Sequence, residues 1–97
     1  MNKKNILEEA NGLVYGDRAA DYGSVLDNFT TTAALWSPIL KITVTAEQVA
    51  LCMGQVKVAR QIYKPKRDNL VDGAGYFACL EIMQEEILAK NKERTQP

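Results

Sequence analysis

Apolar residues recur along the chain at intervals of three and four positions, the spacing that places them on one face of an α-helix. Four stretches show this spacing, namely 5–14, 24–39, 45–64 and 68–90. The β-branched segment 41–44 is too short for a sheet and has no partner strand, so we interpret it as a connector. The pattern predicts an all-α fold, arranged as a four-helix bundle or as paired helical hairpins.

Each predicted helix has an apolar face that we expect to be buried. The first face holds Ile6, Leu7, Ala10, Leu13 and Val14, and the second holds Val25, Leu26, Phe29, Ala33, Trp36 and Ile39. The third holds Val49, Cys52, Met53, Val56, Ala59 and Tyr63, and the fourth holds Leu70, Ala74, Phe77, Leu80, Met83 or Gln84, and Ile87. Because both cysteines lie within apolar patterns, we expect Cys52 and Cys79 to be buried thiols.

Residues that favour helix ends mark the predicted boundaries. Thr45 followed by Gln48 predicts a capping box at the start of the third helix. Asp21 or Ser24 can cap the second helix, and Pro38 is expected to weaken its end. Pro65 is expected to stop the third helix.

Composition limits the class of protein. The chain has 97 residues and no net charge, which predicts one small domain over 1–97 with a frayed tail at 91–97 and disfavours binding to a DNA or RNA polymer. No apolar run is long enough to span a membrane and no secretion signal is visible, so we expect a cytoplasmic protein. So small a chain buries little surface, which favours a homo-oligomer.

Basic residues concentrate before and within the turn between the third and fourth helices. Between Gln48 and Arg67 there are basic residues and no acidic one. Lys57, Arg60 and Lys64 fall on one helix edge, and an edge of this kind either faces solvent or binds an anion such as phosphate. The sequence therefore predicts a candidate anion site here.

Acidic and aromatic residues open the fourth helix. Asp68, Asp72 and Tyr76 fall on one face, with Asn69 beside them. Asp and Asn commonly cap helices and complement the helix dipole. The two carboxylates can instead hold magnesium, accept from a ribose or base, or pair with Lys57 and Arg60.

The Gly-bracketed segment 16–23 is a second candidate binding element. It contains Arg18, Asp21 and Tyr22, a mixture of charged and aromatic groups that is frequent in binding loops. A simple capping segment is the alternative interpretation. With no His and two Cys in the chain, a zinc site is excluded, and only ions that prefer oxygen ligands, such as magnesium, remain.

These residues occur in an order that resembles a known family. The order is Arg18…Tyr22-Gly23…Asn28…Leu35-Trp36…Lys57-x-x-Arg60…Asp68-Asn69-x-x-Asp72-x-x-Gly75-Tyr76. It resembles a small phage and prophage protein family of unassigned function, from about Ile6 to Glu86. The resemblance implies a protein that acts in the cytoplasm of a bacterial host.

A more remote similarity is to the all-α nucleoside triphosphate pyrophosphatases of the MazG type. Those enzymes hold magnesium with Glu-x-x-Glu on one helix and Glu-x-x-Asp on the next. This chain has Lys57-x-x-Arg60 at the first position and Asn69-x-x-Asp72 at the second. Replacing anionic metal ligands with cations removes the attraction for magnesium and creates attraction for phosphate.

Three hypotheses follow. The first is non-catalytic binding of a small nucleotide by Arg18, Asp21, Tyr22, Asn28, Lys57, Arg60, Asp68, Asn69, Asp72 and Tyr76, with no metal or cofactor. In a phage, such a protein would act as a sponge that sequesters a host immune signalling nucleotide. The second is a magnesium-dependent nucleotide pyrophosphohydrolase or phosphodiesterase of MazG-like type, and the third is a helical interaction protein that binds no ligand.

Overall fold

A computed structural model of the chain describes residues 3–16, 21 and 23–95. Within these residues it contains helices α1 (Ile6–Tyr15), α3 (Val25–Leu40), α4 (Ala46–Tyr63) and α5 (Arg67–Thr95). The described residues include no strand, so the predicted all-α class is confirmed. All four predicted helical stretches are helices, and the segment 41–44 is a connector as expected.

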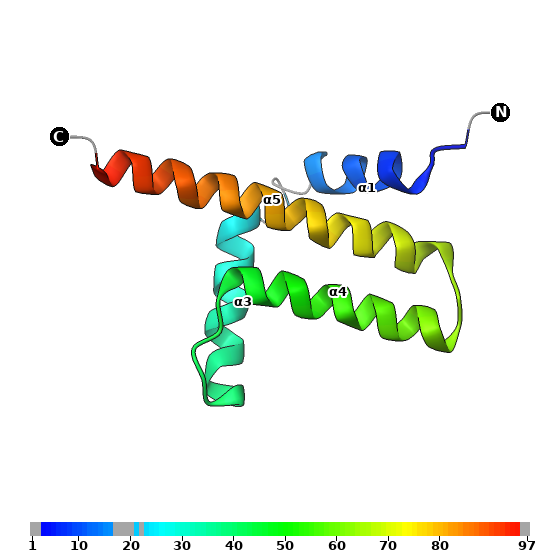
Figure 1. Ribbon diagram of the computed structural model, residues 1–97, viewed down its shortest axis with the longest axis horizontal. Coiled ribbons are helices and arrows are strands. Elements are labelled where there is room, and N and C mark those ends of the chain that lie inside the picture. Colours follow the sequence, from blue (N-terminus) through cyan, green and yellow to red (C-terminus); the bar gives the residue numbers. More distant parts are fainter. Residues whose placement is uncertain (1–2, 17–20, 22, 96–97) are drawn as a thin grey trace.

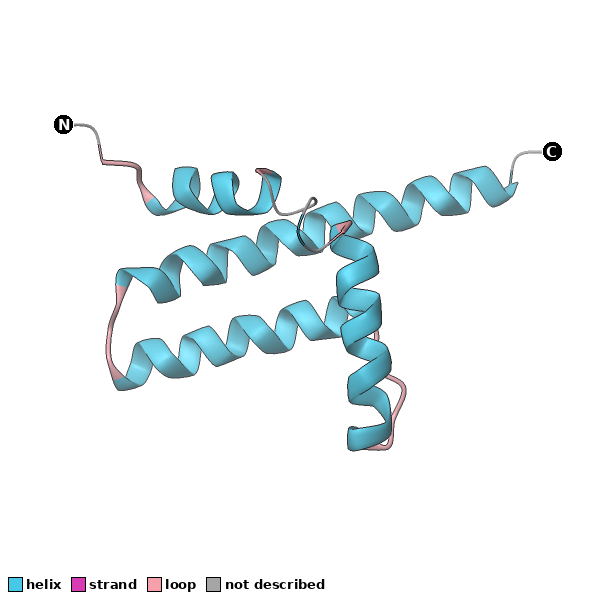
Figure 2. Cartoon of the chain, turned by 180° about the vertical axis from the view of Figure 1, so that it is seen from behind, coloured by secondary structure: helices cyan, strands magenta, loops and turns pink. Residues whose placement is uncertain are grey.

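Helix α5 is the element around which the other described helices are arranged, since each of them contacts it. Helices α4 and α5 form an antiparallel hairpin, and α1 lies along the first half of α5 (Figure 1). Helix α3 crosses the hairpin on its back, as the view from behind shows (Figure 2). The opposite face of the hairpin is therefore not covered by α3.

Side chains cap the helix starts in the way the sequence predicts. Thr45 and Gln48 form the expected capping box, with the Gln48 N–H donating to Thr45 Oγ1 at 3.1 Å and the Thr45 N–H donating to Gln48 Oε1 at 2.9 Å. Ser24, one of the two predicted candidates, caps α3 by accepting from the Asp27 N–H at 3.0 Å. Caps of this kind satisfy backbone donors that the first turn leaves unpaired.

The connection between α3 and α4 is held by one hydroxyl. Ser37 Oγ donates to the Ala33 carbonyl at 2.8 Å and accepts from the Val44 N–H at 2.9 Å. Lys41 adopts the left-handed conformation that ends α3, with φ at 59°. Pro38 lies inside the last turns of α3, which ends soon after it at Leu40.

The core lies where α3, α4 and α5 meet. Its buried members are Val25, Leu26, Phe29, Ala33, Val49, Ala50, Cys79 and Met83. Trp36 packs against this cluster from its edge. The core is therefore small, and it draws on only part of each predicted apolar face.

Several residues that we expected to be buried are exposed instead. They are Leu7, Leu13, Ile39, Cys52, Val56, Ala59, Tyr63, Leu70 and Phe77. The prediction of burial was wrong for these positions because amphipathic periodicity assumes that the apolar face meets another element of the same chain. Cys79 is buried as expected, whereas Cys52 is not.

Helix α5 extends further than its apolar pattern predicted, continuing past Lys90 to Thr95. Glu86 and Lys90 are spaced four positions apart in the favourable order, and Lys92 and Arg94 in the last turn suit the negative end of the helix dipole. None of the described helices is both long enough and apolar enough to cross a membrane.

Candidate functional site

A basic hollow lies beside the turn between α4 and α5, and we call it the basic corner. It is lined by Lys57, Ala59, Arg60, Tyr63, Lys64, Lys66, Asp68 and Asn69. Its volume is about 580 Å³, within the roughly 300–1,000 Å³ typical of small-ligand sites. The hollow therefore lies at the turn where the sequence predicts a candidate anion site.

Gln61 fixes the shape of this turn. Its Oε1 accepts from the Lys66 backbone N–H at 3.0 Å and from Asn69 Nδ2 at 3.2 Å. Asn69 is only 8% exposed, so Gln61 also satisfies a buried polar group. One carboxamide thus ties the last turn of α4, the connecting residues and the first turn of α5 together.

Lys57 and Asp72 neutralise each other across the hairpin. Lys57 Nζ lies 2.9 Å from Asp72 Oδ2, and both side chains are largely shielded from water. Pairing between these groups was one of the three roles we considered for the acidic residues. Asp72 therefore contributes little free negative charge to the basic corner.

The remaining cations of the basic corner have no carboxylate partner within the described residues. These cations are Arg60, Lys64 and Lys66, and Asp68 is the one carboxylate that lines the hollow. By contrast, Arg67 has a structural role on another side of α5. It pairs with Glu9 and donates to the Lys4 carbonyl at 2.7 Å, which ties α1 to α5.

The aromatic side chain at the basic corner is Tyr63. It is 91% exposed and lines the hollow beside Arg60 and Lys64. Tyr76, which we included among the predicted ligand-binding residues, does not line the corner and packs edge-to-face on Phe29 with ring centroids 6.3 Å apart. A base bound at the corner would therefore meet Tyr63.

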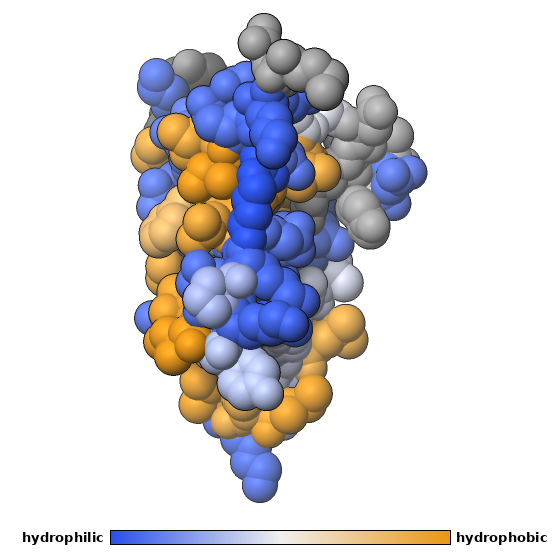
Figure 3. Space-filling view, turned by 90° about the vertical axis from the view of Figure 1, so that its right-hand side faces the viewer, coloured by the Kyte–Doolittle hydropathy of each residue, from blue (hydrophilic) through white to orange (hydrophobic). Residues whose placement is uncertain are grey.

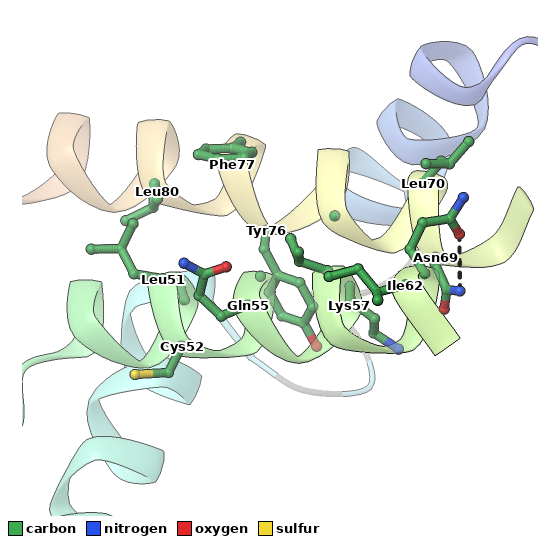
Figure 4. Close-up of a pocket in the computed structure, with 15 residues that line it drawn as sticks. Leu51, Cys52, Gln55, Lys57, Ile62, Asn69, Leu70, Tyr76, Phe77 and Leu80 are labelled. Carbon is green, nitrogen blue, oxygen red and sulfur yellow. Dashed lines mark hydrogen bonds between the residues drawn. The ribbon is translucent and has the colours of Figure 1, made fainter. Parts of the chain in front are cut away.

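Tyr76 lines a different hollow, which lies along the interface of α4 and α5 on the face that α3 leaves open. We call it the apolar groove (Figure 4). Its large apolar side chains are Leu51, Val58, Ile62, Leu70, Phe77 and Leu80. The groove and the basic corner share Lys57 and Asn69.

The predicted site residues divide into three groups. Lys57, Arg60, Asp68 and Asn69 line the basic corner, and Asp72 reaches it through Lys57. Asp21, Asn28 and Tyr76 do not line it. Arg18 and Tyr22 lie outside the described residues.

Some residues at the corner were not among the predicted site residues. Ala59, Tyr63, Lys64 and Lys66 line the corner, although Lys64 was named on the basic helix edge, and Gln61 holds the adjoining turn. Lys66 carried a usable signal, because it belongs to the basic run that the sequence shows. Tyr63 was assigned to the apolar face of its helix. Gln61 has no feature in the sequence that distinguishes it from any other helical glutamine.

Magnesium coordination needs several converging oxygen ligands. In the described part of the chain, no group of three or more acidic or cysteine side chains lies close enough to hold a metal ion. At the corner, Asp68 is the free carboxylate, and Asp72 is engaged by Lys57. The described residues therefore do not fit the metal site of a MazG-type hydrolase.

The fold and the site define a small all-α protein with a basic corner at the turn of a helical hairpin. The chain belongs to the family described as a domain of unknown function, DUF6378, whose model matches residues 5–84. This confirms the predicted membership of a phage protein family of unassigned function, whereas similarity to the MazG type is not shown.

Two phage proteins are similar to the chain. It is 38% identical over 84 residues to the Gene 55 protein of Mycobacterium phage D29, covering 86% of this chain and 56% of that protein. It is 38% identical over 82 residues to the Gene 55 protein of Mycobacterium phage L5, covering 82% of this chain and 53% of that protein. The chain thus spans about half the length of these relatives. No solved structure matches it.

Proposed function

We propose that the protein binds a small phosphate-bearing nucleotide at the basic corner without cleaving it. The observation that carries this proposal is the gathering of Arg60, Lys64 and Lys66 in one hollow with no carboxylate partner among the described residues. Unpaired cations that converge on a concave surface attract anions of small size, and a chain with no net charge is a poor binder of long polyanions.

The chemistry of each residue suggests its role. The planar guanidinium of Arg60 is suited to bidentate contact with a phosphate, and Lys64 and Lys66 supply further positive charge. Asp68 can accept a hydrogen bond from a ribose hydroxyl or a base. Tyr63 offers an exposed ring on which a base can stack, an interaction worth about 1–3 kcal/mol per base in nucleic-acid complexes.

We propose binding without hydrolysis because the basic corner has too few free carboxylates, among the described residues, to hold magnesium. A metal-dependent pyrophosphohydrolase needs acidic residues that hold magnesium on both reacting oxygens. The described residues of the corner provide Asp68 alone, because Lys57 engages Asp72. The same charges that disfavour magnesium favour direct contact between phosphate and protein.

The similarity to phage proteins suggests where such binding would act. We propose that the protein works in the cytoplasm of a bacterial host, as a homo-oligomer that sequesters a nucleotide used by the host as an immune signal. Sequestration requires only tight binding and no turnover.

The test is a retention experiment. The protein is mixed with a panel of linear and cyclic nucleotides and magnesium, and bound, free and heat-released nucleotides are separated by chromatography. We expect one class of nucleotide to be retained and then released intact. Arg60→Ala should abolish retention. Arg94→Ala, which removes the same charge from the exposed end of α5, should leave it unchanged.

Two outcomes would contradict the proposal. Cleavage products that depend on magnesium would make the protein a hydrolase. Failure to retain any nucleotide, or equal retention by the Arg60→Ala variant, would show that the basic corner is not a nucleotide site.

A further inference from the structure

The apolar groove exposes hydrophobic side chains of a size normally found in a protein core. Ile62 is 79% exposed and Phe77 is 70% exposed, and Leu51 and Val58 are each about half exposed. All four belong to one continuous hollow of about 620 Å³ between α4 and α5 (Figure 4). Contiguous apolar surface of this kind marks an interaction site more often than scattered single residues do.

The same face is visible at the edge of the space-filling view. Figure 3 views the molecule from the end that carries the turn between α4 and α5. Hydrophilic residues occupy the middle of this view, and hydrophobic residues run down its left margin, the side that faces the viewer in Figure 1. Polar surface at the turn and apolar surface along the hairpin therefore lie next to each other.

The molecule exposes more surface than a folded monomer of its mass should. Its accessible surface is 7366 Å², whereas a compact protein of 10.8 kDa exposes roughly 5,500 Å². Its radius of gyration is 15.3 Å, against about 12.5 Å expected for this length. Over the whole molecule the excess is about 1,800 Å², against roughly 800 Å² that each partner buries in a stable interface, and the exposed apolar residues of the groove contribute part of it.

The polar residues of the groove are compatible with an apolar cover. Lys57 is neutralised by Asp72, and Gln61 and Asn69 are bonded to each other. Covering these groups therefore leaves no unpaired charge, which would be the main cost of burial. Gln55 carries both a donor and an acceptor, so it can bond with the same residue of an identical surface.

From these observations we infer that a second copy of this chain covers the apolar groove, forming a homodimer through the α4–α5 face. In a two-fold contact the same patch meets itself, and this surface can do so without repulsion because it is largely apolar and its lysine is neutralised. This surface specifies the homo-oligomer of the proposed function. Because the groove shares Lys57 and Asn69 with the basic corner, the second copy would form an additional wall of that corner.

The test compares two isoleucines of nearly equal exposure. Ile62 lies in the groove, whereas Ile39, which is 77% exposed at the end of α3, does not line it. Sedimentation equilibrium without nucleotide should show a dimer for the natural protein and for Ile39→Glu. Ile62→Glu should weaken dimerisation at least about a hundredfold, because its carboxylate would be buried without a partner. Circular dichroism should show the same helix content in all three proteins.

The inference is overturned if the natural protein is monomeric at micromolar concentrations, which would assign the groove to another occupant. It is also overturned if both variants remain dimeric, or if both dissociate equally. Because no nucleotide is present, these results are independent of the retention experiment. A dimer that retains no nucleotide would contradict nucleotide binding alone. A monomer that retains nucleotide would contradict the dimer, and with it the homo-oligomer of the proposed function, but not nucleotide binding.

Discussion

At the scale of single residues, the charges at the hairpin turn serve different purposes although they look alike in the sequence. Lys57 is paired with Asp72 and Arg67 with Glu9, whereas Arg60, Lys64 and Lys66 are left without carboxylates among the described residues. The two pairs link helices, since Lys57 joins α4 to α5 and Arg67 joins α5 to α1. The free ones gather where a ligand can reach them.

The pair of Lys57 and Asp72 should contribute to stability. Asp72→Ala leaves the shielded ammonium of Lys57 without its partner, and we expect the free energy of unfolding to fall by about 1.5–3 kcal/mol. The control Asp68→Ala loses only an exposed first-turn charge, worth at most about 1 kcal/mol. Urea unfolding of both variants measures the difference. Equal losses would mean that the ion pair contributes nothing specific.

Arg60 should act on binding and not on folding. Its side chain is exposed and has no carboxylate partner in the described residues, so Arg60→Ala should change the unfolding free energy by less than about 0.5 kcal/mol. The affinity for the retained nucleotide should fall about ten- to hundredfold, the loss expected for a charged hydrogen bond. Calorimetric titration measures the affinity, with Arg94→Ala as the control. A variant that binds normally but unfolds more easily would reverse the assignment.

At the scale of elements, the helices and their ends follow closely from the sequence. Local signals such as the Thr45 capping box and Pro65 operate within one turn and do not depend on tertiary contacts. The identity of the buried face does depend on such contacts. Phe77 and Ile62 lie on faces that have no neighbour within the described fold, so periodicity alone could not identify them as exposed.

The candidate site, like the fold, was predictable where it depends on local sequence and not where it depends on tertiary contacts. The clustering of Lys57, Arg60 and Asp68 at one turn follows from helix geometry. Lys57 pairs with Asp72 and not with Asp68 because of how far α4 is shifted along α5. This relative position of the two helices cannot be derived from the sequence. Gln61 escaped prediction for the same reason, since its partners Lys66 and Asn69 lie beyond the helix that carries it.

The turn of the hairpin should depend on Gln61. Gln61→Ala leaves the buried Asn69 amide and the Lys66 N–H without this acceptor, and we expect a loss of about 1–3 kcal/mol of stability. Hydrogen exchange should show faster exchange of the Lys66 amide. Asn91→Ala is the control, because Asn91 is exposed towards the end of α5 and its carboxamide makes no hydrogen bond within the described residues. Similar exchange at Lys66 in both variants would show that the turn holds its shape without Gln61.

At the scale of the whole molecule, one chain presents two adjoining surfaces of opposite character. The basic corner lies at the end of the hairpin and the apolar groove runs along its face, with Lys57 and Asn69 at the boundary. The extended dimensions of 53 × 35 × 21 Å follow from helices that spread around α5 and do not close over one another. The proposed dimer would supply contacts that these spread helices lack within one chain.

The central claim is that a nucleotide binds at the basic corner, and mapping of amide chemical shifts tests its location directly. Isotope-labelled protein is titrated with the nucleotide panel and, separately, with inorganic phosphate. We predict that the amide signals of Arg60, Tyr63, Lys64 and Lys66 move together and saturate, with smaller changes for phosphate alone. If no member of the panel moves these signals, or if the changes are confined to the apolar groove, the account of the site is wrong.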